Sequence, residues 1–142
     1  MMESASAGRP AHMMGFTDAV RNALMNNYVN FNGRASRSEY WWFALFAIIV
    51  SFIATALEIA AGVAFLNIIF SLAIFLPYLG LGFRRLHDLG KSGWWLLISF
   101  IPILGFIVLL VFFVMEGENH PNQYGEVPTN TLEHDANIHT NY

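Results

Sequence analysis

The sequence predicts an all-α membrane protein with three transmembrane helices, the first two forming a tight hairpin, and a short amphipathic helix before them. The first observation is composition: the 142 residues are 56% hydrophobic and 12% charged, whereas soluble domains carry about 25% charged residues. A small soluble domain leaves much of its surface in water, so this composition excludes an ordinary soluble domain. The second observation is that the apolar residues are gathered into three long uncharged stretches.

The three uncharged stretches cover residues 40–57, 59–83 and 92–115 and contain 18, 25 and 24 residues. A helix needs about 20 apolar residues to cross the hydrocarbon core of a bilayer. Each stretch therefore predicts a transmembrane helix. We place the spans at about 40–57, 62–83 and 93–115. The only candidate turn between the first two is residues 58–62, which makes them a tight antiparallel hairpin.

The third stretch has an alternative interpretation. Pro102 lies near its middle, and proline removes a backbone donor from a helix. Residues 102–105 could then form the bend of a re-entrant hairpin. Each arm would have only about ten residues, too few to span the bilayer. The sequence leaves this choice open.

An amphipathic helix is predicted at about residues 16–31. Apolar residues recur there every three or four positions, which is typical of one helical face, and they are Phe16, Val20, Leu24, Tyr28 and Phe31. Such a helix lies in the membrane interface or serves as a soluble linker. The predicted organisation is thus one integral membrane domain, residues 16–128. Polar, aperiodic tails at 1–15 and 129–142, the second acidic, are predicted to be disordered.

The cations predict an orientation. Arg34 and Arg37 precede the first span, and Arg84, Arg85 and Lys91 lie between the second and third. Two crossings separate these groups, so both lie on one side, which the positive-inside rule assigns to the cytoplasm. The N-terminus is then cytoplasmic, and a third crossing would place the C-terminal tail outside. No cleavable signal peptide is predicted in the first 30 residues.

Two segments, "FNGRASRSEYWW" and "RRLHDLGKSGWW", share one order of residues: cations, an acid, small residues and a tryptophan pair. Tryptophan pairs at the start of a span are typical interfacial anchors. The predicted anchors are Trp41, Trp42, Trp94 and Trp95. The polar residues of both segments predict a cluster at the cytoplasmic face, made of Arg34, Arg37, Glu39, Arg84, Arg85, His87 and Asp88.

We expect this cluster to hold the inner ends of the helices together. Glu39 and Asp88 are candidates to pair with arginines of the other segment, and pairs of the Arg34–Glu39 and Arg85–Asp88 type are our hypothesis. Two alternatives remain. The cations could hold anionic lipid headgroups or a partner, or His87 and Asp88 could act as an acid–base pair. Adjacent side chains on a helix diverge by about 100°, so the structural interpretation is favoured and no enzyme is predicted.

Small and polar residues predict the faces along which the first two helices pack. Small residues allow close approach of helices in lipid. The predicted seam consists of Ala44, Ala47, Ser51, Ala54 and Glu58 on the first helix with Asn67 and Ser71 on the second. Glu58 could form a proton or cation site with Asn67 and Ser71, but its place near the outer boundary favours an interfacial turn residue.

No metal site and no cofactor is predicted. The absence of cysteine excludes disulfides and thiolate ligands. His134, Asp135 and His139 in the tail match no tetrahedral spacing. The basic patches are short and adjacent to the membrane, so no nucleic-acid partner is expected. The expected partners are the lipid bilayer, with anionic headgroups as one option, and a second copy or another membrane protein.

Three elements together resemble the YhaH/YhaI-like family of small bacterial inner-membrane proteins: "FNGRASRSEYW" (31–41), "RRLHDLGKSGWW" (84–95) and "NQYGEVP" (122–128). The resemblance covers about residues 24–128. It implies a multi-pass protein of the bacterial plasma (inner) membrane, catalogued as a domain of unknown function, with no assigned enzymatic activity. The signature positions it implies are Gly33, Arg34, Arg37, Glu39, Tyr40, Trp41, Arg84, Arg85, His87, Asp88, Gly93, Trp94, Asn122, Tyr124, Gly125 and Pro128.

This chain departs from the family at its last element. Members often have Pro-Gly-Thr as a lead-in and Arg beside the tyrosine, whereas here residues 116–118 read Glu-Gly-Glu and Gln123 precedes Tyr124. The departure weakens the expectation of an anion-binding tail. Three functions remain in order of preference: a structural or protein-interaction module, a protein that handles anionic lipid, a small solute or protons, and a membrane enzyme that uses His87 and Asp88.

Overall fold

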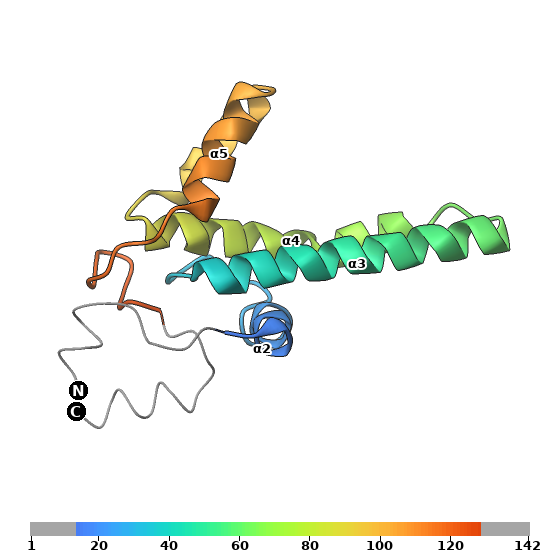
Figure 1. Cartoon of the computed structure of the whole chain (residues 1–142), viewed down its shortest axis with the longest axis horizontal. Coiled ribbons are helices and arrows are strands. Elements are labelled where there is room, and N and C mark those ends of the chain that lie inside the picture. Colours follow the sequence, from blue (N-terminus) through green and yellow to red (C-terminus); the bar gives the residue numbers. More distant parts are fainter. Residues whose placement is uncertain (1–13, 129–142) are drawn as a thin grey trace.

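The structure, a computed structural model, describes residues 14–128, and its regular secondary structure over that range is helical, with one isolated bridge between Asn122 and Gly125 (Figure 1). The predicted tails at residues 1–13 and 129–142 lie outside the described residues. The elements in order are α2 (Phe16–Arg21), η1 (Asn22–Asn26), α3 (Arg37–Ala61), α4 (Leu66–Asp88), η2 (Gly93–Phe100) and α5 (Leu104–Val114).

The long helices α3 and α4 run side by side in opposite directions (Figure 1). α3 begins where the side chain of Ser36 accepts a hydrogen bond from the Glu39 amide, a typical N-cap. It ends at Gly62, whose φ of 70° is the left-handed conformation that glycine adopts most easily. With 25 and 23 residues, both helices are long and apolar enough to cross a membrane. α4 continues to Asp88, so "RRLHD" forms its last turn.

Glu58 fixes the turn between the two long helices. Its carboxylate accepts 2.9 Å hydrogen bonds from the backbone amide and from the side-chain amide of Asn67. Asn67 also donates to the Thr55 hydroxyl at 3.0 Å. A carboxylate at a helix N-terminus satisfies free amides and opposes the helix dipole. Glu58 therefore has the geometry of a capping residue.

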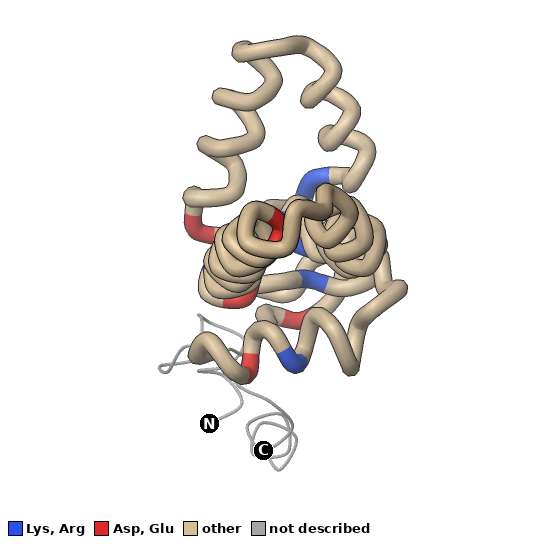
Figure 2. Tube along the Cα trace, turned by 90° about the vertical axis from the view of Figure 1, so that its right-hand side faces the viewer, with Lys and Arg blue, Asp and Glu red and all other residues tan. Residues whose placement is uncertain are grey.

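The prediction of one continuous third helix over residues 93–115 is wrong. The segment forms two arms, the 3₁₀-helix η2 and the 11-residue helix α5, joined by a turn at residues 101–103 (Figure 2). Proline at 102 cannot continue a helical hydrogen-bond ladder. At Gly105 an added Cβ would lie 1.8 Å from the Ile98 carbonyl oxygen, so the missing side chain lets the arms touch.

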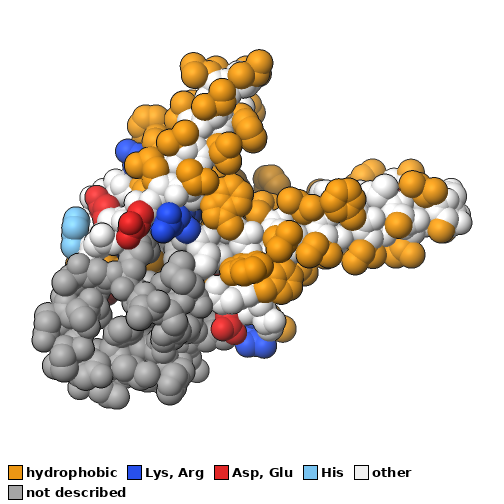
Figure 3. All heavy atoms as spheres, viewed as in Figure 1, with side chains coloured by type: hydrophobic (Ala, Val, Ile, Leu, Met, Phe, Trp, Pro, Cys, Tyr) orange, Lys and Arg blue, Asp and Glu red, His pale blue; other side chains and the backbone are white. Residues whose placement is uncertain are grey.

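This η2–α5 hairpin, residues 93–114, stands away from the α3–α4 pair in Figure 1. At 1.5 Å per residue, α5 is about 16 Å long, roughly half of the hydrocarbon thickness. The segment therefore has the two short arms and the central bend of the alternative interpretation. Beyond its base its surface is apolar on both arms, as the orange spheres of Figure 3 show, with Phe100, Ile103 and Phe106 exposed.

The predicted helix at 16–31 is shorter than expected. α2 and one π-helical turn, η1, end at Asn26, because asparagine side chains offer the backbone local hydrogen bonds that compete with the helix. Asn27 donates to the Asn22 carbonyl at 3.1 Å. The short helix lies crosswise against α3, with Ala19 and Ala23 fully buried (Figure 1).

The predicted seam is only partly a helix contact. Ala44 and Ala54 are buried. Ala47 and Ser51 instead line an open groove on the surface of α3, and Ser71 lines a cavity beside it. The small residues therefore create a recess as well as a contact.

Candidate functional site

Asp88 lies at the centre of the polar end of the molecule, between two arginines. Its Oδ1 is 3.0 Å from Nη2 of Arg34, and its Oδ2 is 2.7 Å from Nη1 of Arg85. All three side chains are at most 1% exposed. The last turn of α4 supplies Arg85 and Asp88, three residues apart and so on one face, and the loop before α3 supplies Arg34.

A second ion pair joins α3 to α4. Nη1 of Arg84 lies 2.9 Å from Oε2 of Glu39, and both side chains are buried. Asn22 of η1 donates to the same oxygen at 2.8 Å. Glu39 thus ties the N-terminal helix to the long helices.

The pairs differ in part from those we expected. Each acid pairs with an arginine of the other segment, Arg34 with Asp88 and Arg84 with Glu39, and the Arg85–Asp88 pair is also present. The expected Arg34–Glu39 pair does not form. Glu39 sits on the face of α3 that meets η1 and Arg84, whereas Arg34 precedes the helix and reaches the end of α4.

The arginines also bind backbone carbonyls, in the C-terminal segment (residues 116–128) and at the end of α5. Arg34 donates to the carbonyls of Glu118, His120 and Gly125 at 2.6, 2.9 and 3.1 Å. Arg85 donates to the carbonyls of Phe113, at 3.3 Å, and Met115. The last carbonyls of a helix have no partner within the helix, and a guanidinium offers five donors in a fixed plane. We call the three buried arginines and the two acids with which they pair the buried ionic cluster: Arg34, Glu39, Arg84, Arg85 and Asp88.

The C-terminal segment lies at the same end of the molecule as this cluster. The Glu118 amide donates to the Asp88 carbonyl at 2.8 Å, and Asn122 donates to the His87 carbonyl at 3.0 Å. The side of the membrane on which the chain leaves the third stretch stays a prediction, but residues 116–128 contact the end of α4 and the loop before α3. The hairpin turns back, so the chain returns to the end of the helix pair at which α3 begins.

His87 and Asp88, which the disfavoured alternative treats as an acid–base pair, have separate partners. Its Nδ1 lies 2.9 Å from the Gly33 carbonyl oxygen, and its ring stacks on Tyr124 with centroids 3.9 Å apart and an interplanar angle of 5°. Both carboxylate oxygens of Asp88 accept hydrogen bonds from arginines. Asp88 is therefore a counter-ion, and His87 packs the C-terminal segment against the loop before α3.

Arg37 stands apart from the buried ionic cluster. It is half-buried and its Nη1 donates to the Val114 carbonyl at 3.2 Å, at the end of α5. One turn further along α3, Trp41 donates to the Phe113 carbonyl at 3.0 Å. Both residues fasten the hairpin to α3.

The four predicted tryptophan anchors are all exposed at this end of the molecule. Trp42 meets Phe16 of α2 edge-on at 5.9 Å. Trp94 and Trp95 begin η2 with 70% and 44% exposure, and Lys91 lies 5.8 Å from the Trp95 ring centroid. Their position is compatible with an interfacial level at the start of α3 and of η2.

Sequence reasoning missed the partners that complete the cluster. Asn22 gave no signal, because one asparagine among four has no distinguishing spacing. Asn122 and Tyr124 were recognised as signature positions of the resemblance, but their contacts with His87 were not foreseen. Backbone carbonyls accept most of the hydrogen bonds that the arginines donate. Every residue has such a carbonyl, so the sequence does not show which ones the arginines bind.

The geometry limits what this end of the molecule can do. Arg34, Arg84 and Arg85 are at most 8% exposed and are directed at acids and carbonyls inside the protein. They are not placed to hold lipid headgroups. Within residues 14–128, no group of three His, Asp or Glu side chains is arranged to bind a metal ion. The cluster's evident effect is to join four segments of the chain.

Comparison with known proteins places these features in a family context. The family described as "Protein of unknown function (DUF805)" matches residues 28–126. The chain is 45% identical over 108 residues to the inner membrane protein YhaI of Escherichia coli strain K12, covering 75% of this chain and 92% of that protein. It is 39% identical over 111 residues to the inner membrane protein YhaH of the same strain, covering 74% and 92%. No solved structure matches this chain.

Proposed function

We propose that this chain, which belongs to the DUF805 family of proteins of unknown function, is a structural module that binds another membrane protein or a second copy of itself. Its relatives are inner membrane proteins, and it is itself a helical protein of the bacterial inner membrane. We propose no catalytic step for any residue. The role of the η2–α5 hairpin as the interaction arm is the specific part of the proposal.

The observation that carries the proposal is the internal pairing of the buried ionic cluster. Its charges are used to fasten the loop before α3, the end of α4 and the C-terminal segment to one another. The hairpin is attached to this fixed base through Arg37, Trp41 and Arg85. A rigid base with a projecting apolar arm favours a scaffold over a reaction centre.

Photo-crosslinking in intact membranes tests the proposal. A photoreactive phenylalanine analogue placed at Phe106, which is 67% exposed on the hairpin, should give a protein adduct of defined mass. The matched control is the same analogue at Phe52, which is 72% exposed on α3 and should give lipid adducts alone. An adduct of twice the chain mass identifies a second copy as the partner. Lipid adducts alone at both positions would contradict an interaction role for the hairpin.

A further inference from the structure

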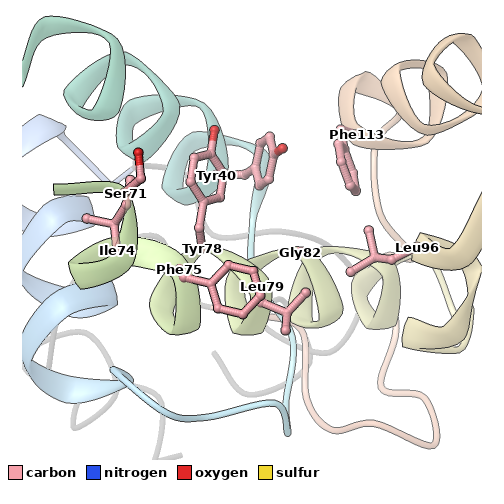
Figure 4. Close-up of a pocket in the computed structure, with 9 residues that line it drawn as sticks. All are labelled: Tyr40, Ser71, Ile74, Phe75, Tyr78, Leu79, Gly82, Leu96 and Phe113. Atoms are coloured by element: carbon pink, nitrogen blue, oxygen red, sulfur yellow. The ribbon is translucent and has the colours of Figure 1, made fainter. Parts of the chain in front are cut away.

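A cavity of about 400 Å³ lies where the η2–α5 hairpin leaves the long helices. In Figure 4 the side chains of Phe113 from α5 and Leu96 from η2 point toward α4 near Gly82, across an open space. Tyr40 of α3 and Ser71 and Tyr78 of α4 also line the cavity. The wall is largely apolar, and the cavity is open to the surface of the protein.

The cavity continues into a groove along α3. Ile74 and Tyr78 line both the cavity and a second hollow of about 490 Å³, whose far wall includes Ala47, Ser51 and Thr55. The two hollows adjoin at Ile74 and Tyr78 and follow the long helices from Tyr40 toward Thr55, and we call the pair the recess. If α3 and α4 cross the bilayer, the recess runs parallel to the lipid chains.

The shape of the recess favours a flexible chain as occupant. A helix is about 10 Å across with its side chains and rises 5.4 Å per turn, so one turn fills about 400 Å³. Each hollow would therefore hold about a single turn of a partner helix. A lipid acyl chain, which is narrow and bends, fits along both hollows.

A cation precedes the cavity wall on α3. Arg37 is one helical turn before Tyr40, and it donates to the carbonyl of Val114, the neighbour of the lining residue Phe113. It is half-buried, unlike the arginines of the buried ionic cluster. A cation at the cytoplasmic headgroup level attracts lipid phosphate.

We propose that this recess binds one phospholipid, with an acyl chain along Tyr78 and Ser51 and the phosphate beside Arg37. This site differs from the proposed interaction surface. The lipid would lie between the hairpin and the long helices, whereas a protein partner would bind the outer surface of the hairpin. The lipid would act as packing that holds the hairpin at its angle.

Native mass spectrometry of the full chain, purified in a mild detergent, tests the site. The wild type should retain one phospholipid per chain. Ser71→Phe fills the cavity and should lower retention about tenfold, whereas Leu72→Phe, on the adjacent exposed position outside the recess, should leave it unchanged. Ala47→Phe fills the groove from α3 and should act like Ser71→Phe, so that a folding defect of one variant does not decide the outcome.

Arg37→Gln tests the phosphate position. Retention should fall about fivefold, the equivalent of about 1 kcal/mol for one cation near a phosphate. Arg21→Gln, on the exposed side of α2, is the control and should have no effect. If all variants retained the same amount of phospholipid, the lipid would be non-specific annular lipid around the protein, and the proposal would be overturned. A lipid-free dimer in the wild type that Ser71→Phe converts to a monomer would also overturn it, since a second copy would then fill the recess.

Discussion

Asp88 shows how a single buried acid can determine the arrangement of distant segments. Two guanidiniums, from Arg34 and Arg85, surround its carboxylate in a site closed to solvent. A buried charge is tolerated only when its charge and hydrogen-bonding capacity are satisfied. Because those arginines also bind carbonyls of residues 113–125, the acid indirectly positions the C-terminal segment.

Neutralising Asp88 should therefore destabilise the protein strongly. Asp88→Asn keeps the shape of the side chain but leaves two buried arginines without a full counter-charge, and breaking a buried pair costs about 3–5 kcal/mol. The measurement is the thermal unfolding midpoint in detergent. Asp18→Asn is the control, because the Asp18–Arg21 pair is 3.7 Å long and both side chains are well exposed. Equal stability of the two variants would contradict the central role of Asp88.

At the residue scale, the sequence predicted which residues gather but not how they pair. Repetition of the same residue order before two spans was enough to place Glu39 and Asp88 near the arginines. It could not show that Arg34 reaches Asp88 and not Glu39, because the spacing along a loop does not give the direction of a side chain. Arg37 was predicted to belong to the same cluster, but it binds the Val114 carbonyl at the end of α5 and not an acid. Its spacing in the sequence could not show this direction either.

At the scale of elements, the η2–α5 hairpin depends on two small features of an otherwise apolar segment. Pro102 interrupts the helix, and Gly105 lets α5 approach the Ile98 carbonyl. The apolar composition of residues 92–115 is the same for a span and for a hairpin, so periodicity could not choose between them. For α3 and α4, by contrast, the long uncharged stretches predicted two antiparallel helices. The turn between them lies at residues 62–65 and not at 58–62, because α3 extends to Ala61 and α4 begins at Leu66.

The hairpin should be sensitive to a single added methyl group at its crossing point. In Gly105→Ala the new Cβ would meet the Ile98 carbonyl oxygen, and overpacking of this kind costs about 1–3 kcal/mol. We expect a lower unfolding midpoint and faster proteolysis of residues 93–114. Gly15→Ala is the matched control, because nothing lies within 4 Å of an added Cβ there. Unchanged stability of Gly105→Ala would show that the arms do not touch as described.

At the scale of the whole molecule, the hairpin predicts a topology other than the one that the cations alone predicted. The chain is fastened at residues 116–128 to the loop before α3, so both ends of the described range lie on one side (Figure 1). The positive-inside rule still assigns that side to the cytoplasm, because Arg37 and Lys91 lie there with the cluster. In this predicted topology Glu116 and Glu118 share a side with the cations, and Arg34 binds the Glu118 carbonyl.

Single cysteines should reveal this topology, because the chain has no native cysteine. Asn32→Cys and Asn119→Cys are exposed positions at the cluster end, and Ala61→Cys is exposed at the opposite end of α3. With a membrane-impermeant thiol reagent, we expect Ala61→Cys to react in cells whose inner membrane is intact. Asn32→Cys and Asn119→Cys should react only after that membrane is permeabilised. If Asn119→Cys also reacted with the reagent in intact cells, as Ala61→Cys should, residues 93–115 would cross the bilayer once. The hairpin would then not persist in the membrane.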